Sequence, residues 1–380
     1  MKAMKTGAMK TNAMLFLGAL LAGPAAAIPR PDHVVMLILE NHGDSSVIGS
    51  TYAPYINKLA GDSLTAKFTQ SFALTHPSQP NYLMLFSGSK QGITDDAVPG
   101  NLPFKTANLG ASLLAKSLTF IGYSDDLPSI GFTGATSNGY ARKHAPWVNW
   151  QGTGVNGIPS TAHLPFTGFP TDYTTLPTLS IVVPNLQHDM HDGTVAQSDT
   201  WIKTYLDGYV QWAKTHNSLF ILTFDEDENK GGPNRVPTFF LGPMVKKGSY
   251  SSIINHYNVL RTLEDMYGLT HSGEAATANP ITEVWRTPTA VGQADLQRLQ
   301  PRLSAQASAA GQAMVFNFPR IRDPSAELEI RAIDGKWIHR AALRAGMESY
   351  AWKYGKQGER KFFARLRDGK DEASFVFTLP

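Results

Sequence analysis

The chain has 380 residues, a formal net charge of +3 and no cysteine. Without cysteine there can be neither disulfides nor thiolate metal sites, so any metal ion must be held by oxygen and imidazole ligands. The small net charge, with no run of lysine and arginine, gives no indication of a nucleic-acid partner.

The first 27 residues have the layout of a secretory signal. A basic start, an apolar run and a small-residue cleavage site follow one another: Lys2, Lys5 and Lys10, then residues 13–21, then Ala25 to Ala27. The apolar run is shorter than the roughly 20 residues that a membrane-spanning helix needs. We therefore expect a signal peptide over residues 1–27 and a mature protein that is secreted, periplasmic or attached to the cell surface.

Three short apolar runs have the composition of strands that are buried on both faces of a parallel sheet, at residues 33–39, 179–183 and 219–223. Segments with helical spacing lie between and after them, at residues 55–64, 109–117, 200–216 and 258–267. This alternation predicts an α/β fold with a doubly wound, mostly parallel sheet and helices on both faces. Ligands bind such sheets beyond the carboxyl ends of the strands.

The region around residues 123–173 is rich in glycine, proline and aromatic residues and is predicted to form long loops over the sheet. After residue 300 the pattern changes to short alternating segments, at residues 313–318, 326–333, 336–343, 349–354, 361–366 and 373–379. We therefore expect a catalytic domain over residues 28–300 and a small C-terminal β-sandwich over residues 301–380. No cluster of catalytic residue types occurs in that tail, which favours a role in attachment, sorting or stabilisation.

Polar clusters follow each of the three predicted strands. Glu40 and Asn41 offer a carboxylate and an amide oxygen that suit a divalent cation, although an ordinary turn would use the same residues. Asp225 and Glu226 open a run of four acids after the third strand. Such runs are usually solvated loops, but the position next to a buried strand favours metal ligation by the first two acids and solvation of Asp227 and Glu228.

The segment His188-Asp189-Met190-His191-Asp192 places two imidazoles and two carboxylates within five residues. It can supply metal ligands, an imidazole that binds phosphate, or a histidine oriented by a carboxylate. A polar loop with a capping aspartate is the alternative interpretation.

A proline-restrained turn at residues 75–82 carries the hydroxyls of Thr75 and Ser78 and the imidazole of His76. A hydroxyl beside a divalent cation loses its proton more readily and can attack phosphorus. Lys143 and His144 supply cations that can hold phosphate oxygens, although a solvated basic turn has the same composition. His256 is a lone histidine, which is more often structural.

The order of these motifs resembles the phosphoesterase family of bacterial and fungal acid phosphatases and phosphatidylcholine-type phospholipases C, in the alkaline phosphatase superfamily. The resemblance covers roughly residues 33–270 and rests on Glu40-Asn41, Ser78-x-Pro-Asn81, Pro184-Asn185, Asp189 to Asp192, Asp225-Glu226 and the block Tyr140 to Trp147. It implies that Ser78, rather than Thr75, is the nucleophile and that Asn81 steadies the phosphoryl oxygens. It also implies a metal ion held by Glu40, Asn41, Asp225 and Glu226, with Asp189 as a further ligand.

The chain departs from its two-zinc relatives, which carry an Asp-x-x-x-His pair where this sequence has Asn185-x-x-x-Asp189. They also carry an Asp-His pair in place of Asp225-Glu226. We therefore expect one divalent ion, Ca, Mg, Mn or Zn. Tyr82 stands where sulfatases of the superfamily carry an arginine, which argues against sulfatase activity.

The expected function is that of an acid phosphatase that cleaves small phosphate monoesters through a phosphoserine. Asn81, Lys143, His144 and His191 would compensate charge on the phosphoryl oxygens, with His76 also at the substrate and His191 as the proton donor. Two alternatives stay open. One is a phospholipase C or other phosphodiesterase, which alone would contact membranes. It should have a wide apolar entrance, for which Trp147, Trp150 and the Phe/Gly-rich loop at residues 166–169 are candidates. The other is a non-catalytic surface protein that binds phosphate or metal.

Overall fold

The structure is a computed structural model that describes residues 28–286, 304–307, 313–318, 320–332, 337–353, 361–368 and 371–378. The chain divides into two compact units, Met1–Thr287 and Pro288–Pro380. The signal peptide predicted over residues 1–27 and the domain boundary predicted at residue 300 both lie outside the described residues.

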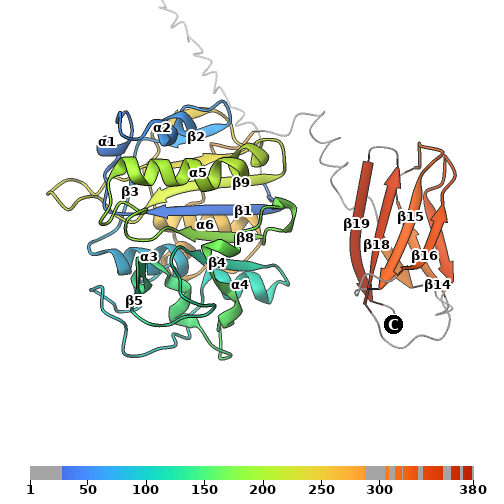
Figure 1. Cartoon of the computed structure of the whole chain (residues 1–380), viewed down its shortest axis with the longest axis horizontal. Helices are drawn as coiled ribbons and strands as arrows, with labels where there is room; N and C mark the ends of the chain where they lie inside the picture. Colours follow the sequence, from blue (N-terminus) through green and yellow to red (C-terminus); the bar gives the residue numbers. More distant parts are fainter. Residues whose placement is uncertain are drawn as a thin grey trace, which may run out of the picture. The chain divides into compact units, whose positions relative to one another are not determined.

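The first unit is built on an eight-stranded sheet (Figure 1). Its strands are β1 (His33–Leu39), β2 (Thr65–Phe68), β4 (Phe120–Ser124), β7 (His163–Pro165), β8 (Leu179–Val183), β9 (Ser218–Phe224), β10 (Thr238–Leu241) and β11 (Gly248–Tyr250). Their order is β11-β2-β10-β9-β1-β8-β4-β7, and within this sheet only β10 runs antiparallel to its neighbours. The three predicted strands form its centre, so the predicted doubly wound, mostly parallel sheet is confirmed.

Helices cover both faces of the sheet, as predicted. They are α2 (Pro54–Ala60), α3 (Ser78–Ser87), α4 (Leu109–Ala115), α5 (Val195–Ala213) and α6 (His256–Met266). Side chains of β1 alternate between two hydrophobic clusters, one shared with α3, α4 and α6 and the other with α2 and α5. Because both faces are covered, β1 is apolar from Val34 to Leu39 rather than alternating.

Helix α3 replaces the turn that was predicted at residues 75–82. It begins at Ser78, directly after Pro77, and all ten of its residues are buried. Pro80 is tolerated in the first turn because the N–H groups there have no partner within the helix. The helix ends at Gly88, whose φ of 67° is the left-handed conformation that glycine adopts without strain. The predicted nucleophile therefore lies at the N-terminus of a buried helix.

The predicted loop region contains short strands and turns rather than open loops. It includes β5 (Thr136–Ser137), β6 (Tyr140–Ala141) and single helical turns at Arg142–His144 and Pro146–Trp150. Trp147 and Trp150 are fully buried. A Cβ on Gly122 of β4 would lie 2.1 Å from the ring of Trp147, so only glycine allows this close packing.

The second unit consists of two antiparallel sheets with a common core. One contains β13 (Ser304–Ala307), β14 (Ala313–Asn317) and β17 (Ser349–Lys353), and the other β15 (Glu327–Ala332), β16 (Trp337–Ala342), β18 (Lys361–Asp368) and β19 (Asp371–Thr378). Phe316 and Trp352 from the first sheet cluster with Leu328, Ile330 and Phe362 from the second. The small C-terminal β domain is confirmed, although β13 was not predicted.

None of the helices in the described part of the chain is long and apolar enough to cross a membrane.

Candidate active site

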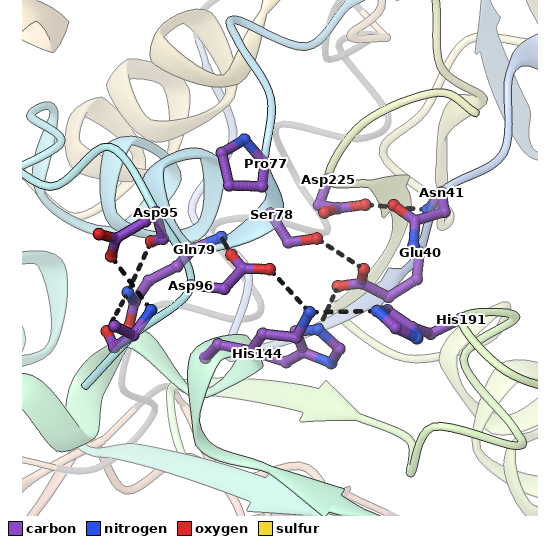
Figure 2. Close-up of polar contacts among 12 residues, drawn as sticks. Glu40, Asn41, Pro77, Ser78, Gln79, Asp95, Asp96, His144, His191 and Asp225 are labelled. Atoms are coloured by element: carbon purple, nitrogen blue, oxygen red, sulfur yellow. Dashed lines mark hydrogen bonds and ion pairs between the residues drawn. The ribbon is translucent and has the colours of Figure 1, made fainter. Parts of the chain in front are cut away.

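The predicted site residues meet beyond the carboxyl ends of the central strands. Glu40 directly follows β1, Asp225 directly follows β9, and Asp189 lies on the loop after β8. Ser78 faces Glu40 from the start of α3 (Figure 2). This convergence follows from the parallel arrangement of β8, β1 and β9, whose carboxyl ends share one edge of the sheet.

The Ser78 hydroxyl lies between two carboxylates. Its Oγ donates to Glu40 Oε2 across 3.0 Å and lies 3.3 Å from Glu226 Oε1, and the side chain is almost fully buried. One turn further along α3, the Tyr82 hydroxyl donates to Glu40 Oε1 across 2.5 Å. A proton leaving Ser78 therefore has two acceptors within hydrogen-bond distance.

Four buried carboxyl groups of the site have raised pKa values, with burial as the largest cause. The pKa of Glu40 and that of Asp225 lie well above their usual values, because Asp225 and Glu226 respectively add like charge to burial. The pKa of Asp189 rises to about 8 and that of Glu226 to about 7. Asp225 Oδ2 is buried without a hydrogen-bond partner. Buried carboxyl groups that repel one another at close range form an environment that a divalent cation satisfies.

His144 joins two of these acids. Its Nδ1 lies 3.1 Å from Asp189 Oδ2, and its Nε2 lies 3.1 Å from Glu40 Oε1. Burial, followed by the nearby charge of Lys143, keeps the pKa of His144 well below its usual value, so the imidazole is neutral. A neutral imidazole carries a single N–H, and if Nδ1 donates it to Asp189, the lone pair of Nε2 faces a carboxylate. A cation between Nε2 and Glu40 would satisfy both.

Glu40, His144 and His191 offer ligand atoms that all lie within 4.8 Å of one another. His191 is oriented by its backbone N–H, which donates to Asp189 Oδ1 across 2.8 Å. Asp189 thus uses both oxygens to hold histidines, one through its ring and one through its backbone. The geometry gives Asp189 a positioning role; its predicted role as a direct metal ligand stays a prediction.

Lys143 is a cationic side chain at the site. Its Nζ donates to Asp96 Oδ2 across 2.8 Å and lies 3.1 Å from His191 Nε2. The other ring nitrogen of His191 lies 2.7 Å from Asp192 Oδ1. Both nitrogens of the predicted proton donor are therefore engaged by neighbouring side chains.

Asn81 and His76 both contact Glu226. The Asn81 amide donates to Thr75 O across 2.8 Å and to Glu226 Oε2 across 3.0 Å, while its oxygen accepts from the Thr75 N–H. The ring of His76 lies 3.2 Å from Glu226 Oε2 and 3.3 Å from Asp227 Oδ1. The amide of Asn81 is thus occupied by the protein itself, and its predicted contact with phosphoryl oxygens stays a prediction.

Two expectations about neighbouring residues are corrected. Asp227, predicted to be solvated, is only 8% exposed, because His76 covers it. Glu228 is partly buried and accepts a hydrogen bond from the Gly43 N–H across 3.0 Å. The acidic run therefore packs against His76 and the segment that follows β1 instead of pointing into solvent.

Asn41 and His256 fix Asp225 from opposite sides. Asn41 adopts a positive φ of 49°, which asparagine tolerates better than most residues, and its N–H donates to Asp225 Oδ1 across 3.1 Å. His256 Nε2 lies 2.8 Å from the backbone oxygen of Asp225, and burial lowers the pKa of His256 to about 4. The contact gives His256 a structural role, which is the more common role of a lone histidine.

Residues 50–270 match the family model described as "Phosphoesterase family". The chain belongs to the phosphoesterase family. Family membership makes it a hydrolase that acts on phosphate esters, as the motif order predicted.

Named relatives of this phosphoesterase are phosphatases. It is 46% identical over 266 residues to a phosphatidylinositol-3-phosphatase of Mycobacterium tuberculosis, covering 69% of this chain and 85% of the relative. It is 29% identical to a phosphate-repressible acid phosphatase of Penicillium chrysogenum, covering 57% of this chain and 55% of the relative. The chain therefore spans about half the length of that fungal enzyme. A solved structure of an alkaline phosphatase superfamily protein from Vibrio parahaemolyticus aligns with a TM-score of 0.49 and 12% identity, over 87% of this chain and 82% of that one.

All of the predicted site residues of this phosphoesterase lie in one connected group of contacts, and the group also includes Tyr82 and Asp96, neither of which the sequence assigned to the site. Tyr82 was considered in the sequence only as a departure from sulfatases, yet its hydroxyl holds Glu40. Asp96 lies in a loop without any recognisable pattern, yet it binds both Lys143 and the backbone N–H of Gln79. Tyr82 could have been predicted to lie at the site, because it is one helical turn after the predicted nucleophile. Nothing in the sequence indicated Asp96.

Proposed function

We propose that this chain is an exported, metal-dependent phosphomonoesterase of the acid phosphatase type that acts through a phosphoserine at Ser78. The observation that carries this proposal is the position of the Ser78 hydroxyl, which starts a buried helix and lies within 3.3 Å of both Glu40 and Glu226. The relatives named as phosphatases support a monoester substrate. The mycobacterial relative also makes a phosphoinositide a reasonable substrate to test.

The chemistry of the donor set fits one divalent cation. Glu40, Asn41, Asp225 and Glu226 would hold it from the oxygen side, and the unpartnered Oδ2 of Asp225 is a free donor for it. His144 is an imidazole donor on the other side of Glu40, whereas both ring nitrogens of His191 already contact Lys143 and Asp192. A cation bound there would act as a Lewis acid that acidifies the attacking hydroxyl and neutralises phosphoryl charge. Oxygen donors favour Ca, Mg or Mn, and the imidazoles keep Zn possible.

Ser78 Oγ would attack phosphorus in line with the ester bond. The Oγ–P bond forms, the ester P–O bond breaks, and the electron pair leaves with the alcohol oxygen, which takes up a proton. The Ser78 proton passes to Glu40 or Glu226, the two acceptors of its hydroxyl. A water oxygen then attacks phosphorus, the Oγ–P bond breaks, Ser78 Oγ regains a proton and inorganic phosphate leaves. The N-terminus of α3 favours the negative charge of the phosphorylated state.

Lys143, His144 and His191 surround the phosphoryl group in this proposal. Lys143 lies 3.1 Å from His191 Nε2, so the proton for the leaving alcohol would come from this hydrogen-bonded pair rather than from an isolated imidazole. His76 contacts Glu226 and is partly exposed, which keeps it available to the substrate. These contacts support charge compensation around a small phosphate ester.

The phospholipase alternative loses one of its expected features. A phospholipase should have a wide apolar entrance, for which Trp147, Trp150 and the loop at residues 166–169 were candidates. Both tryptophans are fully buried and Phe166 is buried, while Phe169 is partly exposed. A non-catalytic binding protein has no need of a hydroxyl between two carboxylates. The monoesterase is therefore the function we place first.

The decisive experiment combines turnover with trapping of the intermediate. Purified protein is given p-nitrophenyl phosphate with and without chelator, quenched in acid, digested and analysed by mass spectrometry. We expect chelator-sensitive turnover and a phosphorylated peptide that contains Ser78. Turnover with no such peptide, and with full activity in Ser78→Ala, would overturn the covalent mechanism. A complete lack of hydrolysis with every divalent ion supplied would favour the non-catalytic alternative.

Export is tested separately by expressing the full chain with its first 27 residues and sequencing the N-terminus of the protein outside the cytoplasm. We expect mature protein that begins at Ile28. Unprocessed protein confined to the cytoplasm would contradict this part of the proposal.

A further inference from the structure

Lys143 is the one lysine or arginine within residues 28–286 that hydrogen-bonds to a residue of the site. Its Nζ contacts Asp96 Oδ2 at 2.8 Å and His191 Nε2 at 3.1 Å. A lysine ammonium group has three N–H bonds. The third has no partner among the described residues, and the side chain is 20% exposed. One donor of this cation is therefore free within the site.

Asp96 holds this cation from a rigid position. Its other oxygen accepts from the Gln79 N–H across 2.9 Å, next to the nucleophile in the chain. The Gln79 side chain in turn donates to the backbone oxygens of Asp95 and Ala97, across 2.9 and 2.8 Å (Figure 2). One carboxylate thus fixes both the start of helix α3 and the ammonium group of Lys143.

Lys143 and Asp96 form an ion pair. Burial alone would raise the pKa of Asp96, but the hydrogen bond and charge of Lys143 outweigh burial and lower it. Burial would likewise lower the pKa of Lys143, but the contact with Asp96 outweighs it and raises the pKa. The ion pair with Asp96 across 2.8 Å thus keeps a cation at this position.

The charge of the substrate decides what such a cation can do. A phosphomonoester near pH 7 carries a second negative charge, because its second pKa is about 6, and it has three free phosphoryl oxygens. A phosphodiester carries one charge and has two free oxygens. The buried acids Glu40, Asp225 and Glu226 repel the doubly charged group more strongly. The divalent ion held by these acids offsets part of this repulsion. A second positive charge near the phosphoryl group is therefore needed chiefly when the substrate is a monoester.

We propose that Lys143, held in place by Asp96, is the residue that makes this site prefer phosphomonoesters to phosphodiesters. The inference rests on the proposed function, because it requires a site that hydrolyses phosphate esters. Lys143 contacts the additional oxygen of the monoester, and Asp96 is a positioning residue that acts through Lys143.

The test compares two substrates with the same leaving group, p-nitrophenyl phosphate and methyl p-nitrophenyl phosphate. The variants are Lys143→Met, which removes the charge at similar length, and Asp96→Asn, which keeps an acceptor for the Gln79 N–H. We expect kcat/KM for the monoester to fall on the order of 10- to 100-fold in Lys143→Met, as for one charge-assisted hydrogen bond. The ratio of monoester to diester kcat/KM should fall at least about 10-fold.

The chain offers a matched control in Lys214→Met. Lys214 Nζ lies 2.7 Å from Asp62 Oδ2, and its side chain is 17% exposed, close to the exposure of Lys143. This pair contacts none of the predicted site residues. We expect Lys214→Met to leave the ratio of the two substrates unchanged, which separates loss of a buried ion pair from loss of a substrate contact.

A double variant tests the positioning role of Asp96. If Asp96 acts through Lys143, the double variant Asp96→Asn with Lys143→Met loses no more monoester activity than Lys143→Met alone. Multiplied losses would show that Asp96 acts elsewhere. Calorimetric binding of inorganic phosphate and dimethyl phosphate gives a readout without turnover: Lys143→Met should weaken binding of inorganic phosphate more than that of dimethyl phosphate.

The outcomes separate this inference from the proposed function. If the wild-type protein hydrolyses neither ester, the proposed function has failed. If it hydrolyses the monoester but Lys143→Met reduces both substrates by the same factor, the proposed function stands and the role of Lys143 in specificity is wrong.

Discussion

Ser78 Oγ donates a hydrogen bond to Oε2 of Glu40 across 3.0 Å, although 38 positions separate the two residues in the chain. Ser78 begins a helix on one face of the sheet, and Glu40 is the first residue after the central strand. Their contact exists only when α3 is packed against β1. The reactivity of the hydroxyl therefore depends on the folded core. Substitutions near Ser78 that preserve the packing of this core test function rather than folding.

Removal of the hydroxyl should abolish catalysis without unfolding the protein. We expect Ser78→Ala to lower kcat for p-nitrophenyl phosphate by on the order of 10⁴-fold or more, because the covalent step has no nucleophile. The variant should unfold within a few degrees of the wild type, since alanine favours helices. Thr75→Ala is the control and should keep most activity. Retained activity in Ser78→Ala would move the nucleophile to Thr75 or to water.

Divalent cations should stabilise the protein against heat. Binding to the folded state alone adds about 2.7 kcal/mol at a cation concentration of 100 times Kd, and it relieves the repulsion between Glu40 and Asp225. The measurement is the unfolding temperature with chelator and then with each of Ca, Mg, Mn and Zn. Asp225→Asn should lose most of the increase, whereas Asp62→Asn, in a remote ion pair, should keep it. An equal increase in both variants would place the cation elsewhere.

Tyr82→Phe should impair activity while preserving the packing of the ring. The hydroxyl donates to Glu40 Oε1, and the ring stacks on His144 with centroids 5.3 Å apart. Loss of a hydrogen bond to a buried carboxylate costs about 1.5–3 kcal/mol, so we expect kcat/KM to fall on the order of 10-fold. Tyr209→Phe, whose hydroxyl contacts Ser218 on the far end of β9, is the control. Equal kinetic effects in the two variants would contradict a role for Tyr82 at the site.

Glu264 should make stability depend on pH. Its side chain is fully buried in α6, and burial raises the pKa of Glu264 from 4.5 to about 7. The folded state therefore holds this proton more tightly than the unfolded chain does. As pH rises from about 5 to about 8, ionisation of Glu264 should cost up to about 3 kcal/mol of folding free energy.

Glu264→Gln isolates this effect. Glutamine retains an acceptor for the Ser272 N–H, which donates to Glu264 Oε1 across 2.8 Å, but it cannot ionise. The free energy of unfolding of the variant relative to wild type should increase between about pH 5 and pH 8. Denaturant titrations at several pH values measure this difference, and a difference that stays constant with pH would refute the prediction.

Asp199 should be important for stability but not for catalysis. Its two oxygens accept from the backbone N–H groups of Tyr55 and Ile56, across 3.0 and 2.7 Å, at the start of α2, whose own N-cap residue provides no side-chain hydrogen bond. Asp199→Ala leaves both groups unpaired and should cost about 2–4 kcal/mol. Asp199→Asn retains one acceptor and should cost less. Unfolding in urea measures both variants, and kcat/KM should stay near the wild-type value.

Sequence patterns predicted the centre of the fold correctly because that centre has a strong local signature. Strands β1, β8 and β9 are buried on both faces, so they appear as predominantly apolar runs. The polar residues at their ends stand out against these runs. Parallel strands place such ends at one edge, and this general rule was enough to bring the predicted site residues together.

Helix α3 could not be recognised from local pattern. It is buried all around and contains Pro80, so it lacks both the amphipathic spacing and the composition that indicate a helix. The sequence also did not decide whether Trp147 and Trp150 are buried, because an aromatic side chain in a glycine-rich segment can line an entrance or fill the core. Their burial depends on neighbours such as Gly122, which lie far away in the chain.

The sequence by itself determined the α/β architecture, the order of its central strands along the chain and the chemical types of the groups at their ends, because these follow from local burial and spacing. Only the tertiary structure decided that Tyr82 holds Glu40 and that Asp96 holds both Lys143 and the backbone next to Ser78. These contacts join segments whose separation in the chain carries no periodic signal, and they form only when packing of the whole unit sets side chains to within hydrogen-bond distance.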